Sequence, residues 1–311
     1  MKELSRAAVA KRTSVAVRRR LAPMTPEEWR KHGRDLAVPE GNLFMIEVGA
    51  ETDRVPVLVL HGFPTASWDF EEAAAIVAQG RRVVLFDFLG FGFSSKPRDL
   101  GYSLFEQADV ACAIARAAKI ERAHLWTHDM GTSVATELLA RRERGLLPFE
   151  IASVTLHNGS VHIGMAHLSV VQKLLKSRAG DLVSRFMGKS TFSLQMKRIC
   201  GKPPTEAALE GMWNLLSRDE GTRRLPRIIH YNDDRALHAG RWIGALRRLD
   251  LPMLVAWGAL DPISLMSIGE RLARETQGAR LVRWDDLGHY PHMEDPGRVA
   301  KTLMEFLADL G

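Results

Sequence analysis

The sequence predicts an α/β fold in which a doubly wound, mostly parallel sheet carries a helical insertion. Short continuous apolar runs bounded by turn residues are typical of strands buried on both faces of a parallel sheet. These runs alternate with segments whose apolar residues recur at the helical period, which indicates repeated βαβ units. One long stretch, 160–245, breaks the alternation because it contains only helical patterns.

Seven segments have the character of strands. The first is LFMIEVGA at 43–50, and it is followed by two apolar runs, VPVLVLH at 55–61 and VVLFDF at 83–88. The remaining expected strands are 123–128, 151–157, 252–257 and 280–284.

Capping residues mark where two helices begin. Thr25 and Pro26 precede two acidic residues, the pattern of an N-cap with a first-turn proline. Ser103 and Glu106 form a capping-box signature that opens 104–118, where alanines recur on one face. The remaining expected helices are 131–143, 167–176, 206–217, 265–276 and 297–309.

The pattern divides the chain into a tail, a core and a cap. We expect a basic disordered tail at 1–24, a core at 25–159 and 246–311, and a helical cap at 160–245. The tail is rich in arginine and poor in acids. That composition is typical of a mitochondrial targeting peptide and equally of a plain disordered tail, and both interpretations stay open.

Composition restricts the class of protein. The chain has 311 residues, a net charge of +6 and a hydrophobic fraction of 46%, without an apolar run long enough to span a membrane. Much of the positive charge lies in the tail, so we expect no nucleic-acid partner. Cys112 and Cys200 form neither a disulfide framework nor a metal cluster, which favours the cytoplasm, with Cys112 as a buried thiol. We expect no metal and no cofactor; the oligomeric state is open.

The sharpest motif is Thr127-His128-Asp129-Met130-Gly131, between an expected strand and an expected helix. Its layout, with small residues flanking a central side chain, is that of a nucleophile elbow, and here the central residue is Asp129. The helix N-terminus would help to keep this carboxylate ionised. The alternative is that Asp129 is an ordinary N-cap. His128 should point away from the nucleophile and is given no catalytic role.

Two further residues follow Asp129 in the order nucleophile, acid, histidine. Asp261 follows the strand at 252–257, and His289 follows the strand at 280–284. Ligands of such sheets bind beyond the carboxyl ends of the strands, so the three side chains are expected to converge there. Taken singly, Asp261 has the alternative of a turn aspartate and His289 that of a loop histidine.

His61-Gly62-Phe63-Pro64 ends the strand at 55–61. In this arrangement the loop supplies one backbone N–H of an oxyanion hole, and the residue after the nucleophile supplies the other, which predicts Phe63 and Met130. Gly62 permits close approach of the backbone, and Pro64 favours a cis peptide. A plain turn explains the same residues.

These motifs resemble the epoxide hydrolase and haloalkane dehalogenase branch of the α/β-hydrolases, whose nucleophile is an aspartate. Within that branch, DFLGFGFSSKP at 87–97, YSLFEQ at 102–107, RWIGAL at 241–246 and HYPHMEDP at 289–296 resemble the mesoderm-specific transcript protein family. The similarity covers roughly 25–311. It implies an α/β-hydrolase fold with a helical cap inserted after the sixth strand.

The resemblance also implies a mechanism. Asp129 attacks an sp³ carbon of a small hydrophobic substrate, and the resulting ester is hydrolysed by water that His289 activates while Asp261 orients the imidazole. Epoxide hydrolases place two cap tyrosines over the epoxide oxygen. Tyr231 matches the second position, but no tyrosine lies between 160 and 230, so the first is missing.

Three functions remain open. The first is an epoxide-hydrolase-like enzyme. The second is a haloalkane dehalogenase or another hydrolase of activated carbon or esters. Dehalogenases hold the halide with a Trp after the nucleophile, where this chain has Met130, and with an Asn or Trp elsewhere. In this chain Trp213 or Trp242 would have to bind the substrate instead. The third is a non-catalytic ligand-binding protein, because fold does not fix function.

Overall fold

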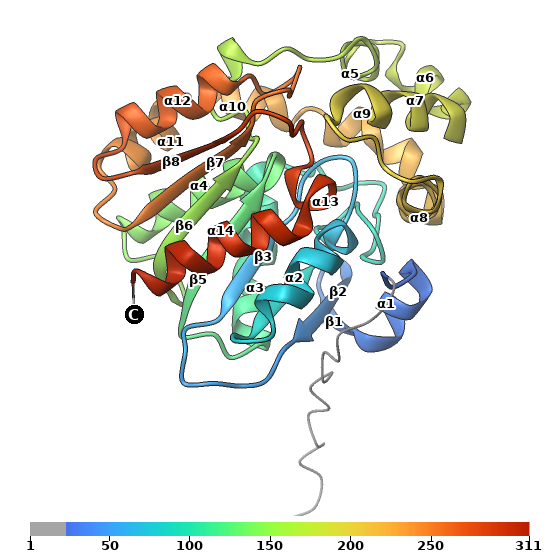
Figure 1. Cartoon of the computed structure of the whole chain (residues 1–311). Helices are drawn as coiled ribbons and strands as arrows, with labels where there is room; N and C mark the ends of the chain where they lie inside the picture. Colours follow the sequence, from blue (N-terminus) through green and yellow to red (C-terminus); the bar gives the residue numbers. More distant parts are fainter. Residues whose placement is uncertain (1–22, 311) are drawn as a thin grey trace, which may run out of the picture.

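The computed structural model describes residues 23–310 and is built around one eight-stranded sheet (Figure 1). Along the sheet the order is β1-β2-β4-β3-β5-β6-β7-β8. The pairs β1–β2 and β2–β4 are antiparallel, and every other pair is parallel. The strands are β1 (Arg34–Val38), β2 (Gly41–Val48), β3 (Val57–Leu60), β4 (Val83–Phe86), β5 (Arg122–His128), β6 (Glu150–His157), β7 (Met253–Gly258) and β8 (Arg280–Trp284).

All seven predicted strands are confirmed, and the one that the apolar pattern missed is β1. This strand lies at the edge of the sheet and pairs only with β2. Its side chains are mostly exposed, whereas those of β3, β4 and β7 are buried throughout. Strand β1 begins with two charged residues, Arg34 and Asp35, and has no continuous apolar run, so its sequence lacks the signal that identified the buried strands.

Helices cover both faces of the sheet. One face carries α2 and α14, which pack together, and the other carries α3, α4, α11 and α12 (Figure 1). The N-cap predicted at Thr25 and the capping box predicted at Ser103 are present, and Thr25 also forms a capping box, so these side chains fix the first residues of α1 and α3. The bounds are α1 (Pro26–His32), η1 (Ser67–Phe70), α2 (Glu71–Val77), α3 (Leu104–Ala117), α4 (Met130–Arg142), α11 (Ala239–Arg247), α12 (Met266–Glu275), α13 (Pro291–Glu294) and α14 (Pro296–Ala308).

Between β6 and β7 the chain forms a helical region that contains no strand among its described residues, as the sequence predicted. Its yellow-green to gold helices α5 to α9 gather at the upper right of Figure 1. Sequence patterns identified α5 and α8 but missed the other helices, several of which are too short for two full helical repeats. The bounds are η2 (Ile163–Met165), α5 (Val170–Lys176), α6 (Gly180–Phe186), α7 (Lys189–Ile199), α8 (Glu206–Ser217), η3 (Arg218–Arg224), α9 (Leu225–Ile228) and α10 (Tyr231–Leu237).

Three other predictions concern the tail, the membrane and the cysteines. Apart from Pro23 and Met24, the predicted tail at 1–24 lies outside the described residues. Within 23–310 no helix is long and apolar enough to cross a bilayer. Cys112 is buried as predicted, and burial raises the pKa of its thiol.

Candidate active site

Asp129 occupies a tight turn between β5 and α4. Its φ of 43° lies in the left-handed region, which is rare for a residue with a side chain. A Cβ on Gly131 would come within 2.1 Å of the Leu60 carbonyl oxygen, so the turn requires glycine there. Among the described residues the Asp129 carboxylate caps no helix N–H, unlike an ordinary N-cap. The predicted elbow geometry is therefore present.

The loop after β3 holds one oxygen of this carboxylate. Parallel pairing places Leu60 opposite Thr127, so the chain beyond β3 runs beside the elbow. The backbone N–H of Phe63 donates to Asp129 Oδ2 at 3.0 Å. A Cβ on Gly62 would lie 2.6 Å from His128 Nδ1 and 2.9 Å from Asp129 Cβ, so only glycine allows this approach.

Two features support the predicted pair of backbone donors. Tyr290 donates its phenol to the Phe63 carbonyl oxygen at 3.1 Å, which fixes the loop, and the Phe63–Pro64 peptide is cis as predicted. Met130 is buried and begins α4, so its N–H belongs to the first turn, whose donors have no partner within the helix.

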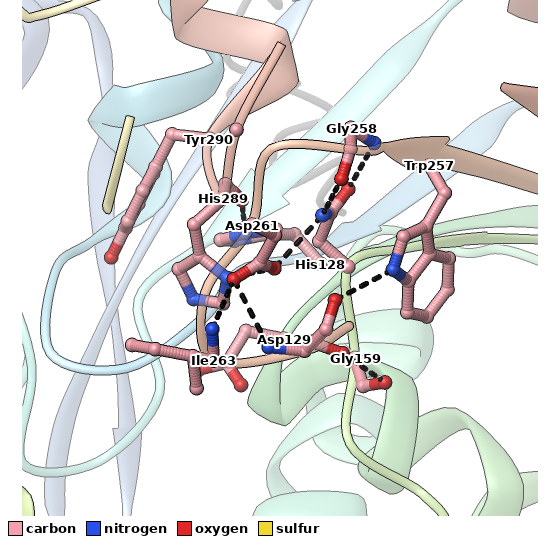
Figure 2. A network of polar contacts seen from close by, with 12 residues as sticks. His128, Asp129, Gly159, Trp257, Gly258, Asp261, Ile263, His289 and Tyr290 are labelled. Atoms are coloured by element: carbon pink, nitrogen blue, oxygen red, sulfur yellow. Dashed lines mark hydrogen bonds and ion pairs between the residues drawn. The ribbon is translucent and has the colours of Figure 1, made fainter. Parts of the chain in front are cut away.

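His289 and Asp261 form a buried pair next to the elbow (Figure 2). His289 Nδ1 lies 2.6 Å from Asp261 Oδ2. Burial alone would lower the pKa of His289, but the charge of Asp261, its hydrogen bond and the charge of Asp129 outweigh burial and raise it. The imidazole is thus held with Nδ1 toward Asp261, which leaves Nε2 for chemistry.

The carboxylate of Asp261 is fixed from several directions. Its Oδ1 accepts the N–H groups of Ile263 at 2.8 Å and Ser264 at 3.0 Å. Its Oδ2 accepts Asn158 Nδ2 at 2.9 Å, and Asn158 also bonds the backbone of Gly258 (Figure 2). Sequence reasoning missed Asn158; its position directly after β6 was the available signal.

His128 turns away from the carboxylate of Asp129, as expected. Its Nε2 lies 2.7 Å from the backbone carbonyl oxygen of His289. Burial, reinforced by the neighbouring histidines, lowers the pKa of His128 well below its usual value. The neutral ring therefore ties the elbow to the loop that carries His289.

The residue that sequence reasoning missed most clearly is Arg235, on α10. Its guanidinium is buried, with Nη2 at 3.3 Å from the Asp129 carbonyl oxygen and 3.5 Å from Asp129 Oδ1. Nε donates to Ser133 Oγ at 2.8 Å, and Nη1 donates to Asn232 Oδ1 at 3.0 Å. A cation thus lies beside the carboxylate oxygen that Phe63 leaves free. The available signal was its position one helical turn after Tyr231.

Tyr231 lies beside Arg235, whose Cζ is 4.5 Å from the centre of the phenol ring. Its ring also contacts Phe63 with a centroid separation of 5.7 Å. Burial and then the charge of Asp129 raise the pKa of this phenol. Tyr231 therefore remains a protonated donor near the elbow.

The two predicted tryptophans are engaged elsewhere. Trp242 donates its indole N–H to Glu137 Oε2 at 2.9 Å, beside the ion pair of Arg241 with the same carboxylate. Trp213 packs against Phe192 with a centroid separation of 5.8 Å. Among the described residues, neither tryptophan lines the cavity at His289, and neither do Tyr231 and Arg235. The contact of Trp213 and Trp242 with substrate therefore stays a prediction.

That cavity is apolar and small. It reaches His289 and Phe63 and is walled by the inserted helices, through Leu175, Phe192 and Met196. Its volume is about 50 Å³, far below the several hundred Å³ of a typical small-molecule pocket. A substrate larger than a few atoms therefore requires the inserted helices to move. A second cavity of about 680 Å³, between α1 and α8, is lined by other residues.

Comparison with known proteins agrees with this architecture. The model of the alpha/beta hydrolase fold family matches residues 55–296. LipZ of Mycobacterium tuberculosis is 36% identical over 284 residues, which cover 91% of this chain and 98% of LipZ. The mesoderm-specific transcript protein of Mus musculus is 34% identical, over 81% of this chain and 78% of the mouse protein.

The solved structures show similarity of fold alone, because their sequences are much less similar to this chain. Haloalkane dehalogenase DbeA from Bradyrhizobium elkanii superimposes with a TM-score of 0.75 at 18% identity, covering 89% of this chain and 98% of the dehalogenase. A thermophilic esterase from Thermogutta terrifontis superimposes with a TM-score of 0.70 at 23% identity, over 89% and 98%. Because a dehalogenase and an esterase share this architecture, the reaction has to be argued from the residues of the site. The matched family model and the two close relatives establish that this chain belongs to the α/β-hydrolase fold family.

Proposed function

We propose that this hydrolase opens small apolar epoxides through a covalent ester on Asp129. The observation that carries the proposal is the pair of cap donors at the nucleophile. Arg235 Nη2 lies 3.5 Å from Asp129 Oδ1, and the pKa of the Tyr231 phenol is raised by burial and by the charge of Asp129. A cation and a phenol beside an attacking carboxylate suit a leaving group that develops negative charge on oxygen.

In the first step, Asp129 Oδ1 attacks an epoxide carbon and the carbon–oxygen bond of the ring breaks. The new alkoxide takes the phenol proton of Tyr231, while Arg235 stabilises the negative charge. The charge of Asp129 contributes to the raised pKa of Tyr231 and disappears as the ester forms. Tyr231 therefore becomes a stronger acid while the alkoxide needs its proton.

In the second step, His289 Nε2 takes a proton from water, and the hydroxide attacks the ester carbonyl carbon. The N–H groups of Phe63 and Met130 hold the oxyanion that forms. When the intermediate collapses, the departing diol oxygen takes the proton from His289. The other water proton, now on the Asp129 carboxyl group, returns to the Tyr231 phenolate. One epoxide and one water give one diol.

Arg235 also supplies a group at the site where the first cap tyrosine is missing. Epoxide opening by a single phenol lacks the second donor expected from the resemblance, and the guanidinium of Arg235 supplies positive charge on the same helix face as Tyr231. For dehalogenation the support is weaker, since the indole N–H of Trp242 is donated to Glu137.

The test compares three substrates with one protein: styrene oxide, a bromoalkane and a 4-nitrophenyl ester, followed as diol, bromide and nitrophenolate. We expect diol as the main product. His289→Gln should form a stable adduct, the mass of one styrene oxide, on the peptide that contains Asp129, because its second step lacks a base. Release of bromide without diol would indicate a dehalogenase instead of an epoxide hydrolase, and release of nitrophenolate without diol would indicate an esterase. Binding of all three without turnover or adduct would indicate a ligand-binding protein.

A further inference from the structure

The inserted region carries large apolar side chains on its outer surface. On α5, Val170 and Leu174 are 73% and 45% exposed, and on α6, Leu182 and Phe186 are 59% and 80% exposed. Each pair is spaced by four residues and therefore occupies one face of its helix. The two helices pack against each other. We refer to these four side chains as the apolar face of the cap.

Positive charge accompanies the apolar face. Between 166 and 199 the chain has seven lysines and arginines but only one acidic residue, Asp181. Lys173, Arg178 and Arg185 are exposed, and two of them directly adjoin Leu174 and Phe186 in sequence. Elsewhere in this stretch, Lys176, Lys189 and Lys197 pair with acidic residues of later helices. Lys173, Arg178 and Arg185 thus lie on or between α5 and α6, beside the single acid Asp181, while the seventh cation, Arg198, lies on α7.

Helix α5 forms part of the wall of the cavity at His289, and Met187, directly after α6, also lines it. Val171 and Leu175 of α5 face that cavity, while Val170 and Leu174 face outward. Phe192 of α7 lines the cavity from the other side. Because this cavity is only about 50 Å³, a larger substrate needs the residues that line it, those of α5 and α7 among them, to move. A partner that contacts the apolar face of the cap therefore lies next to the residues that control substrate access to the cavity.

We propose that the apolar face docks on the surface of an anionic lipid bilayer, which delivers apolar substrate to the cavity. Apolar side chains interleaved with lysine and arginine suit the boundary between acyl chains and anionic headgroups. A protein partner or a second copy of this chain would favour an apolar centre depleted of lysine. Docking stands independently of the reaction, whereas substrate delivery rests on the function proposed above.

Co-sedimentation of the full chain with vesicles tests the docking. Vesicles of phosphatidylcholine with phosphatidylglycerol should sediment the protein, and pure phosphatidylcholine vesicles should do so much less. Leu182→Ser with Phe186→Ser should weaken binding about tenfold or more, because two apolar side chains no longer insert. The matched control is Leu146→Ser with Leu260→Ser, which replaces two exposed leucines outside the cap and should bind as wild type. Thermal unfolding midpoints check that both variants fold.

A local probe separates the apolar face from the basic N-terminal segment, which also attracts anionic lipid. A fluorophore on Phe186→Cys should shift to the blue with anionic vesicles, while one on Leu260→Cys should not; the two native cysteines are buried. Equal binding by wild type and the Leu182, Phe186 variant, with no spectral shift, would overturn the proposal. So would a dimer that this variant abolishes, because a second copy would then cover the face. None of these readouts requires turnover, so failure of docking is distinguishable from failure of the epoxide chemistry.

Discussion

The strand ends of the core and the inserted helices contribute to the site in different ways. At the strand ends, backbone N–H groups and core side chains hold Asp129 and Asp261 at short distances. The inserted helices contribute Tyr231 and Arg235, and Arg235 contacts Asp129 only at 3.3 and 3.5 Å. In the proposed reaction, the core thus fixes the nucleophile and base, while the cap supplies groups that act on the substrate.

This difference gives a graded set of expectations. Removing a group fixed by the core should abolish the reaction, whereas removing a group supplied by the cap should slow the first step and leave the second intact. A cap variant that abolishes all activity, or a core variant that barely changes it, would break the comparison.

The largest effect is expected for Asp129→Ala. Without the nucleophile no ester can form, and kcat for styrene oxide should fall by about 10⁴-fold or more. Steady-state diol formation measures this, with the thermal unfolding midpoint as the check on folding. Residual activity above about one hundredth of wild type would mean that water attacks the epoxide directly.

Next is Arg235→Met, which keeps much of the side-chain volume and removes the cation. We expect kcat to fall by about 10²-fold, comparable to the loss of one preorganised donor at a developing oxyanion. Single-turnover ester formation should slow while ester hydrolysis does not. Arg241→Met is the matched control: it also lies in the helical region, but its partner is Glu137. Equal kcat in both variants would remove Arg235 from the mechanism.

Tyr231→Phe should have a smaller effect, about tenfold on kcat with little change in KM, because Arg235 still stabilises the alkoxide. Tyr102→Phe provides the comparison, since that buried phenol donates to the Pro97 carbonyl oxygen. The control should lose about 1 kcal/mol of stability and no activity. An unchanged rate for Tyr231→Phe would leave Arg235 as the sole donor.

The smallest expected effect is a displacement of the pH profile. His289 must be neutral to accept a proton from water, so ester hydrolysis slows as pH falls through its pKa. Although burial opposes the shift, the charge of Asp261 and its hydrogen bond raise that pKa above the usual 6.5, and the charge of Asp129, which adds to the shift in the free enzyme, is absent from the ester. The acid limb for decay of the ester, measured in single turnovers, should therefore have its midpoint above pH 6.5. A midpoint below 6.5 would show that burial dominates once Asp129 is esterified.

The same contrast separates what the sequence predicts from what it does not. Asp129, Asp261 and His289 were identified because each follows a predicted strand, and parallel strands end at one edge of the sheet. Gly62 and Gly131 carry a local signal, since a Cβ on Gly62 would meet the side chains of His128 and Asp129, and one on Gly131 would meet the Leu60 carbonyl oxygen. These features depend on neighbours in sequence or on strand order.

Residues whose role depends on how the inserted helices meet the core could not be predicted. Arg235 lies one helical turn after Tyr231, but that spacing does not show that α10 meets the elbow, and nothing near Trp242 shows that its indole reaches Glu137. For these two residues a contact between distant segments, rather than a local pattern, decides the structure. Strand β1 escaped prediction for another reason, because it begins with two charged residues and has no continuous apolar run.

The most direct test of the account is to let the protein turn over styrene oxide repeatedly in ¹⁸O-water and then to weigh the peptide that contains Asp129. Attack by the carboxylate followed by hydrolysis of the ester exchanges an Asp129 oxygen with water, so the account predicts ¹⁸O in that peptide. The first turnover should give diol whose new oxygen comes from the protein. Diol formation over many turnovers without label in Asp129 would contradict the covalent mechanism.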